Sequence, residues 1–441
     1  MDKLVFLHLS DIHFSKPEPT FDLDIELRNQ IELDVQRMTD GFQQATGILL
    51  CGDIAFSGAR DEYDRASDWI KKLQRLAAVE DGNVWTVPGN HDVNRQTVRK
   101  SQILQDVHAR LRGIPENSIN EQLKQYLNDE LEPHILFEPI KNYNLFAVSF
   151  DCDSTPEQLF WEKDLPLNDG STLKIRGLNS SLISDESDDD ERRSLILSSF
   201  QIGFQEDASV TYMSMCHHPP HLIRQEDEFE DCLQARVAVQ LFGHKHRQRL
   251  NVIDDRLRIS AGAVHPSRRE SGWEPRYNWV SIYADSIGDQ RNLIVEVWPR
   301  IWDQTRRTFE PEVKDGRESR IFPLPLKPWQ GKEIEEHQPH ALPREKGDLT
   351  VGKARYLMEP KRKLVYRFLS LPYNQIIEIA VTLNLLTDKD KGVEGLELFK
   401  RFIERAEKRE MMDKLWDAVE QKYGNANATE NPFGKRELER S

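Results

Sequence analysis

Five short motifs in this 441-residue chain carry carboxylate, amide and imidazole side chains at spacings that suit metal binding. Four of the five stand where an apolar run ends. The motifs are Asp11-Ile12-His13, Gly52-Asp53, Gly89-Asn90-His91-Asp92, His217-His218-Pro219 and Gly243-His244-Lys245-His246. A single Asp-x-His or His-His pair is common in turns and cores, so the chemical signal lies in the ordered set.

The donor atoms in these motifs favour transition metals. Side chains at i and i+2 leaving a strand point the same way, so Asp11 with His13, and His244 with His246, each offer two ligands from one turn. Two Asp, one Asn and four His mix oxygen and imidazole donors, which suits Mn, Fe, Zn, Ni or Co and argues against Ca or Mg alone. Seven ligands are too many for one ion and suit two ions that share a bridging carboxylate.

The elements that would position these motifs are short apolar runs, which we interpret as buried strands. We expect strands at 4–9, 47–51, 83–87, 145–150, 173–178, 209–216, 238–242, 257–261, 279–283 and 293–298. Helical patterns cover residues 25–45 and 61–79, and a polar segment with a helical pattern covers residues 98–133. The early strand–helix–strand order favours a mixed α/β body, and the later run of strands suggests a second sheet packed on the first.

The composition divides the chain into four parts. We assign residues 1–320 to the body and the Pro-rich, polar stretch 321–349 to a semi-extended linker. Residues 350–425 have the periodicity of three or four short amphipathic helices, which predicts a small all-α bundle. The polar tail 426–441 is expected to be flexible.

Charge and hydropathy narrow the classes of function. The net charge is -15; residues from Lys346 onward carry +3, so the first 345 carry -18. An acidic body disfavours broad nucleic-acid binding, although it permits a local basic groove. No apolar run is long enough for a membrane span, and the N-terminus lacks signal-peptide features. Four scattered cysteines predict reduced thiols and a cytoplasmic location.

Taken in order, the five motifs resemble the signature of the calcineurin-like metallophosphoesterase superfamily over about residues 1–300. The resemblance implies a four-layer α-β-β-α sandwich with a dinuclear site at the sheet edge, with Mn or Fe favoured. It implies two ligand sets and a bridge between them: Asp11, His13 and His246; Asn90, His217 and His244; and Asp53. It also implies that His91 protonates the leaving oxygen and that Asp92 orients the His91 ring.

The predicted activity is hydrolysis of a phosphoester, most simply a phosphodiester in a nucleotide or other small molecule. Two cations would lower the pKa of a bridging water, and the resulting hydroxide would attack phosphorus in line. Two alternatives stay open: a DNA or RNA nuclease similar to the repair-nuclease branch, and a signalling protein that senses a nucleotide without turnover. Phosphoprotein hydrolysis also stays open, as do the natural substrate and the oligomeric state.

The C-terminal helical segment carries no cluster of titratable or metal-binding residues. It resembles the death-like, effector-associated modules that are fused to enzymes in bacterial conflict and antiviral systems. The resemblance implies a protein partner with a similar module. The competing interpretation is an appendage that stabilises the body.

Several single residues are weaker candidates. Asn179 ends a predicted strand and would face the metals unless it is a turn residue. His218 and His221 would reach substrate from the rim. Trp273 and Tyr277 would stack on a base unless they belong to the core. The acidic run 184–191 is expected to be a solvated turn.

Overall fold

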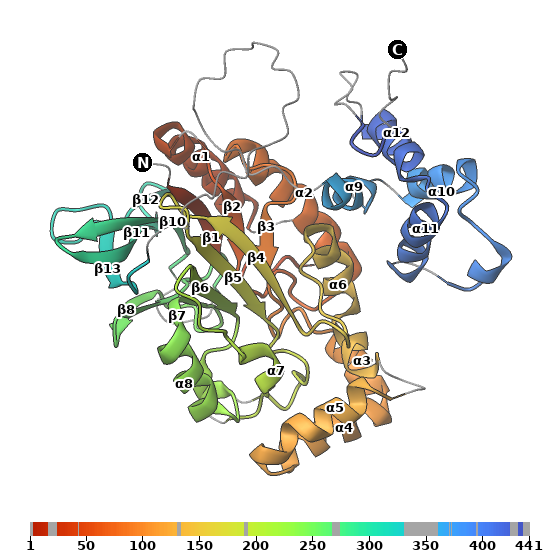
Figure 1. Ribbon diagram of the computed structural model, residues 1–441, viewed down its shortest axis with the longest axis horizontal. Helices are drawn as coiled ribbons and strands as arrows, with labels where there is room; N and C mark the ends of the chain where they lie inside the picture. The colour runs from red at the N-terminus through yellow and green to blue at the C-terminus, as the bar shows by residue number, and fades with distance from the viewer. Residues whose placement is uncertain are drawn as a thin grey trace, which may run out of the picture.

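A computed structural model describes residues 3–15, 24–42, 44–129, 134–188, 193–266, 274–329, 360–369, 371, 373–393, 396–423 and 431–434. Two stacked β-sheets form the body, helices cover their outer faces, and a bundle of helices follows at the C-terminal end (Figure 1). This is the four-layer α-β-β-α sandwich with a small all-α bundle that the sequence predicts. Within these ranges, no helix combines the length and apolar character needed to cross a membrane.

The first sheet has the order β12-β11-β10-β1-β2-β3, and β13 also pairs with β11. Its strands are β1 (Leu4–Leu9), β2 (Gly47–Leu50), β3 (Val84–Thr86), β10 (Arg276–Ile287), β11 (Gln290–Asp303), β12 (Thr308–Pro311) and β13 (Arg320–Pro325). β1, β2 and β3 run parallel and alternate with α1 (Ile25–Phe42) and α2 (Arg60–Leu76). The first three motifs therefore leave the sheet at one edge.

The second sheet has the order β4-β5-β6-β7-β9-β8. Its strands are β4 (Phe160–Pro166), β5 (Thr172–Leu178), β6 (Val210–Cys216), β7 (Val237–Phe242), β8 (Arg249–Ile253) and β9 (Arg256–Ser260). Side chains alternate along β6: Met213 and Met215 face the core shared by the two sheets, whereas Tyr212 and Cys216 pack on the outer side. The outer face is covered by α7 (Ser199–Ile202), η4 (Pro220–Leu222) and α8 (Glu226–Arg236).

The segment between β3 and β4 is helical, and here one prediction is wrong. It contains α3 (Arg95–Lys100), α4 (Gln102–Gly113), η1 (Glu116–Ser118), α5 (Ile119–Leu127), η2 (Ile135–Ile140), α6 (Lys141–Ala147) and η3 (Val148–Phe150). We expected a strand at 145–150. The buried side chains Tyr143, Phe146 and Phe150 follow a helical spacing that becomes visible only when the apolar run is extended backwards.

The body also extends past its predicted end. β13 occupies residues 321–325, which we assigned to the linker, and it pairs antiparallel with β11. Pro323 and Pro325 alternate with Phe322 and Leu324, so the missing N–H groups fall on one side of an edge strand, where they are tolerated. The expected linker from residue 330, residues 350–359 of the helical segment and most of the tail lie outside the described residues.

The acidic run is held in place rather than fully solvated. Nη1 of Arg112 on α4 donates to Asp185 at 2.7 Å, and Nη2 donates to Asp188 at 3.0 Å. Nδ1 of His108 lies 2.8 Å from the same Asp185 oxygen. Residues 189–191 of this run lie outside the described part of the chain. The described acidic residues thus anchor the helical insertion to the body.

The C-terminal bundle consists of α9 (Pro360–Leu369), α10 (Tyr373–Thr382), η5 (Asp388–Asp390), α11 (Leu396–Lys408) and α12 (Met412–Tyr423). It has a hydrophobic core of its own, in which Phe368, Phe402 and Trp416 are buried. Arg367 on α9 pairs with Glu420 on α12 and, at 3.1 Å, with Asp81 of the body. The bundle is therefore a separately packed unit that contacts the body through α9 and through Lys400 of α11, which pairs with Asp153 at 3.8 Å.

A buried ionic cluster ties α1 to the first sheet. Nε and Nη2 of Arg300 each donate to Asp34 at 2.7 Å, and the Tyr277 hydroxyl donates to the same carboxylate. Asp34 is fully buried. Arg37 pairs with Asp34 from the surface at 3.0 Å. Removing one member of a buried pair leaves an uncompensated charge in the core, which is strongly destabilising.

We therefore expect Asp34→Ala to lower the free energy of unfolding of the body by about 3–5 kcal/mol, measured by urea denaturation. Arg37→Ala is the matched control: it removes an exposed partner of the same carboxylate and is expected to change the value by less than about 1 kcal/mol. Equal effects of the two substitutions would contradict a stabilising role for the buried cluster.

Candidate metal centre

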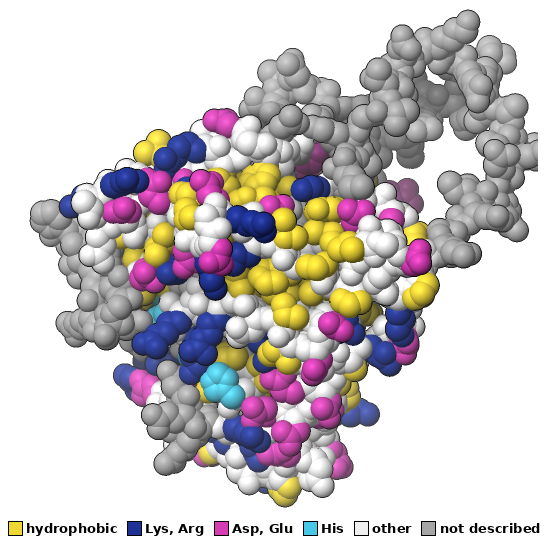
Figure 2. Space-filling view, turned by 90° about the vertical axis from the view of Figure 1, so that its left-hand side faces the viewer, with side chains coloured by type: hydrophobic (Ala, Val, Ile, Leu, Met, Phe, Trp, Pro, Cys, Tyr) yellow, Lys and Arg dark blue, Asp and Glu magenta, His cyan; other side chains and the backbone are white. Residues whose placement is uncertain are grey.

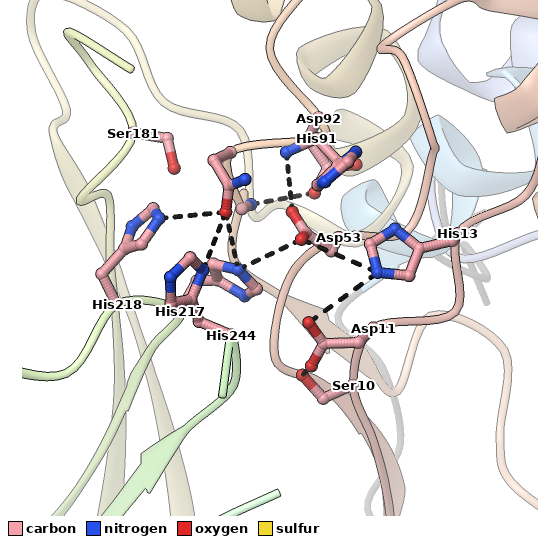
Figure 3. Close-up of polar contacts among 12 residues, drawn as sticks. Ser10, Asp11, His13, Asp53, His91, Asp92, Ser181, His217, His218 and His244 are labelled. Carbon is pink, nitrogen blue, oxygen red and sulfur yellow. Dashed lines mark hydrogen bonds and ion pairs between the residues drawn. The ribbon is translucent and has the colours of Figure 1, made fainter. Parts of the chain in front are cut away.

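Loops that follow β1, β2, β3, β6 and β7 bring all seven predicted ligands together at the junction of the two sheets. Asp11, His13, Asp53, His217 and His244 are labelled in Figure 3. The side chains converge from segments far apart in sequence. They form one group around Asp11 and another around Asn90, with Asp53 between them. The members are Asp11, His13, Asp53, Asn90, His217, His244 and His246.

In the first group, a carboxylate faces two imidazoles. Oδ1 of Asp11 lies 3.3 Å from Nε2 of His246 and 4.0 Å from Nε2 of His13. This oxygen is buried and accepts no hydrogen bond within the described structure. A buried acceptor without a donor calls for a physical explanation, and a cation among these three side chains would supply it.

In the second group, an amide oxygen faces two imidazoles. Oδ1 of Asn90 lies 3.2 Å from Nε2 of His217 and 3.0 Å from Nδ1 of His244. Nδ1 of His217 lies 2.7 Å from the Cys51 carbonyl, so Nδ1 carries the proton that is donated there. In its neutral form His217 therefore presents the lone pair of Nε2 to the site, as a metal ligand must.

Asp53 stands between the two groups. Its Oδ2 lies 3.3 Å from Nε2 of His217 and 3.9 Å from Nε2 of His13. Its Oδ1 accepts a hydrogen bond from the backbone N–H of His91 at 2.8 Å. The carboxylate is thus fixed on one side by the backbone and points between the two groups on the other.

Burial and neighbouring charges set the protonation states of the side chains in the centre. Burial alone would raise the pKa of Asp53, but the charge of His217 and its hydrogen bond hold that pKa well below its usual range. Burial likewise opposes protonation of His217, yet Asp53 and then Asp11 raise the His217 pKa to about 9. Burial lowers the pKa of His13 to about 4. The carboxylates are therefore ionised at neutral pH, and His13 is neutral.

The backbone of the centre is strained. Most of the predicted ligands have a positive φ: Asp11 (53°), His13 (51°), Asp53 (52°), His244 (69°) and His246 (51°). This conformation costs of order 1–3 kcal/mol per non-glycine residue and persists where the surroundings fix it, often at functional sites. Here the N–H groups of Ile12 and His13 both donate to the Asp53 carbonyl at 2.9 Å, which locks the first loop onto the second.

Two glycines let the centre close up. A Cβ atom on Gly52, whose φ is +84°, would lie 2.5 Å from Nδ1 of His217. A Cβ atom on Gly89 would lie 2.1 Å from Oδ1 of Asp53. The His217 and Asp53 side chains therefore pack directly against glycine backbone, and a larger residue at either position would displace them.

The ring of His91 is oriented differently from our expectation. Its Nδ1 lies 2.7 Å from the Phe56 carbonyl, so Nδ1–H donates there and Nε2 is the nitrogen turned to the site. His91 is also within reach of His13 and Asp53. Among the described residues, no hydrogen bond joins the His91 ring to Asp92. The orienting role that we expected for Asp92 is performed by the Phe56 carbonyl.

Asp92 instead fastens two loops together. Its carboxylate accepts hydrogen bonds from the N–H groups of Gly89 (2.9 Å) and Ala55 (3.0 Å) and from the Tyr63 hydroxyl (2.8 Å). Burial and then the charge of Asp53 raise the pKa of Asp92 to about 6. The Asp92 carboxylate therefore holds in place the backbone segment that carries Asn90 and His91.

Sequence reasoning missed the full involvement of two residues. His218 is buried, with Nδ1 2.8 Å from the Ser180 hydroxyl and Nε2 3.1 Å from Oδ1 of Asn90. His217 reaches both Asp53 and Asn90, which favours it over His218 as the ligand. Ser10 Oγ lies 2.5 Å from Oδ2 of Asp11 and holds that carboxylate. In the sequence, His218 was indicated only by its place beside His217, and Ser10 only by its place beside Asp11.

Of the remaining candidates, Asn179 and Tyr277 have structural roles, and His221 is exposed. The Asn179 side chain accepts from the N–H of Ser181 at 2.9 Å, as a turn residue does. Tyr277 is buried against Asp34 and belongs to the core. Trp273 lies outside the described residues.

The donor set fits transition metals. It combines carboxylate and amide oxygens with imidazole nitrogens, and the ligand atoms of Asp11, His13 and His246 lie within 4.8 Å of one another, as do those of Asp11, Asp53 and His217. The four cysteines are free thiols. Burial raises the pKa of the Cys51 and Cys216 thiols, so they are protonated and are poor ligands.

Two packed sheets with such a centre at their edge define the class of metal-dependent phosphoester hydrolases. A family model described as calcineurin-like phosphoesterase matches residues 4–248, and the chain belongs to that family. A second model, described as a GTPase-associated adaptor domain, matches residues 360–421, which coincide with the C-terminal bundle. No curated protein matches the chain.

Three solved structures are similar to this chain at low sequence identity. A predicted phosphoesterase from Streptococcus pneumoniae TIGR4 is 12% identical, with a TM-score of 0.28, covering 73% of this chain and 99% of that one. A putative 5'-nucleotidase from Staphylococcus aureus is 15% identical, with a TM-score of 0.33, covering 73% of this chain and 54% of that one. A purple acid phosphatase from yellow lupin is 10% identical, with a TM-score of 0.37, covering 67% of this chain and 51% of that one.

We expect Gly89→Ala to weaken metal binding by about 10- to 100-fold, because the added Cβ displaces the Asp53 carboxylate. Metal content by elemental analysis and Mn titration by calorimetry measure the effect. Gly41→Ala on α1 is the matched control, since a Cβ there meets nothing within 4 Å. Wild-type affinity in the Gly89 variant would contradict the close packing of this glycine on a ligand.

Proposed function

We propose that the protein is a phosphodiesterase that uses two transition metal ions, Mn or Fe in preference, held by the seven side chains described above. The observation that carries the proposal is the position of Asp53, whose Oδ2 points between an Asp–His group and an Asn–His group. A single carboxylate between two sets of ligands suits a shared bridge.

When bound, the metals supply Lewis acidity for the phosphoryl oxygens and lower the pKa of water. The chain supplies the fixed geometry. Backbone hydrogen bonds hold Asp53, the Cys51 carbonyl sets the tautomer of His217, and Ser10 restrains Asp11. Rigid placement of these groups is what lets binding energy be used for catalysis.

His91 is proposed as the general acid. Its Nδ1–H is engaged by the Phe56 carbonyl, so a proton at Nε2 is the one available to a leaving oxygen. Asp92 supports this group indirectly by pinning the loop between β3 and α3 to Ala55 and Tyr63.

The proposed substrates are nucleotides or other small phosphoesters. The body is strongly acidic, which opposes long-range attraction of nucleic acid. A nuclease activity is the second candidate, and it is favoured by a hollow beside His246 that is lined by basic side chains, among them Arg247 and Arg249. A nucleotide sensor without turnover would need the same centre. Hydrolysis of the bound nucleotide by the metal-loaded protein would exclude this alternative.

The C-terminal bundle is proposed as a non-catalytic adaptor that binds a protein partner, in keeping with the adaptor model that matches residues 360–421. Its core is separate from that of the body, and none of the metal-binding groups in the described part of the chain includes a residue of the bundle. We propose that this pairing of enzyme and adaptor serves cytoplasmic signalling in bacterial conflict or antiviral defence.

His91→Ala is expected to keep its metal and to lose about 100- to 10,000-fold in kcat on an unactivated phosphodiester, because the general acid is gone. The loss on bis(4-nitrophenyl) phosphate is expected to be smaller, since its leaving group needs no proton. Elemental analysis and steady-state kinetics measure both effects.

Asp53→Ala and His134→Ala are the two control variants for that experiment. The first is expected to lose metal and all hydrolysis, because the shared ligand is removed. The second changes an exposed histidine and is expected to leave kcat unchanged. Equal losses on both esters in His91→Ala would contradict the general-acid role.

A chain ending at residue 345 is expected to hydrolyse bis(4-nitrophenyl) phosphate with a kcat within about twofold of the full chain, because the bundle packs separately. Circular dichroism and metal content check that the shortened body is folded and loaded. A folded, loaded body without activity would show that the bundle contributes to the centre.

A further inference from the structure

A hollow of about 610 Å³ opens beside the metal centre, between β8 and the end of the first sheet. One of its walls is His246, whose Nε2 lies 3.3 Å from the Asp11 carboxylate, so the hollow adjoins the candidate centre. The face that carries β8 and β13 is seen in Figure 2, where Lys and Arg side chains gather. We call this hollow the basic groove; its basic side chains are Arg247, Arg249, Arg276, Lys314 and Arg320.

Two of these arginines are fixed by carboxylates. Arg276 pairs with Glu274 at 2.6 Å and with Glu312 at 2.7 Å. Arg320 pairs with Glu312 from the other side. The Nε atom of Arg320 is buried and donates no hydrogen bond within the described structure. Carboxylates therefore hold the Arg276 and Arg320 side chains of the groove in place.

Three basic side chains remain without a carboxylate. Arg247, Arg249 and Lys314 are exposed and, within the described residues, form no ion pair. Arg249 is the first residue of β8, an edge strand, and Arg247 lies two residues before it; both side chains line the hollow. These three charges give the hollow an excess of positive charge in an otherwise acidic body.

We propose that the basic groove binds a further phosphate of the substrate, adjacent to the phosphate cleaved at the metal centre. The groove adjoins His246, so a ligand in the groove extends directly from the centre. Guanidinium groups bind phosphate oxygens in a bidentate manner, and Arg247 and Arg249 supply two such groups. The substrate class is thus a phosphoester that carries at least one additional phosphate. This inference rests on the proposed function.

Two sources present this chemistry: a nucleotide with a polyphosphate and a short single strand of nucleic acid. The acidic body would repel a long strand outside the groove, so recognition is confined to the few phosphates that reach it. The shared prediction is a salt-dependent affinity that depends on Arg247, Arg249 and Lys314.

The experiment uses the metal-loaded full chain and a fluorescein-labelled oligothymidylate, with binding followed by fluorescence anisotropy at several salt concentrations. The groove variant combines Arg247→Gln, Arg249→Gln and Lys314→Gln. The control variant combines Lys124→Gln, Lys389→Gln and Lys408→Gln, which removes the same charge from exposed side chains elsewhere. Elemental analysis checks that all three proteins carry the same metal content.

The groove variant is expected to bind the strand about tenfold more weakly or worse, and its slope of log affinity against log salt is expected to be smaller by about 2. The control variant is expected to match the wild type. Displacement of the strand by ADP at similar affinity would identify the nucleotide polyphosphate as the source, and displacement by unlabelled strand alone would identify nucleic acid.

Equal affinity of the wild type and the groove variant would overturn the proposal, as would equal weakening of both variants or no binding of either ligand by the wild type. Hydrolysis of bis(4-nitrophenyl) phosphate by the wild type tests the proposed function separately. Groove-dependent binding without that hydrolysis would remove the phosphodiesterase and leave the anion site standing.

Discussion

Two carboxylates buried side by side are the constraint on which the rest of the structure depends. The ligand oxygens of Asp11 and Asp53 lie within 4.8 Å of each other and of the His217 ring, and both residues are almost fully buried. Like charges this close repel in a medium that water cannot screen. The positive charge of protonated His217 offsets part of the repulsion between the two carboxylates.

That constraint explains the architecture around the centre. The loop after β2 is the hub: its carbonyls at Cys51 and Asp53 accept hydrogen bonds from His217 Nδ1 and from the backbone of the first loop. Its N–H groups at Ile54 and Ala55 donate to Asp92. Several residues are held in strained conformations at the hub, and the two-sheet core supplies the stability that keeps them there.

Much of the body could be predicted from local pattern. Buried strands such as β6 and β7 are short apolar runs, and the five motifs follow the strands that carry them. Prediction failed where a local pattern fitted two structures. The run at 145–150 is too short to show its period, β13 tolerates proline only because it is an edge strand, and the edge strands β4 and β8 are half polar.

The sequence by itself determined the residue types of the centre, their order and the family to which the chain belongs, because ligand chemistry is a local property of side chains. Only the tertiary structure decided which carbonyl orients His91, that Asp92 serves the backbone, and that basic residues from distant strands surround one hollow. Those facts depend on contacts between segments tens of residues apart in the chain, and no local spacing encodes them.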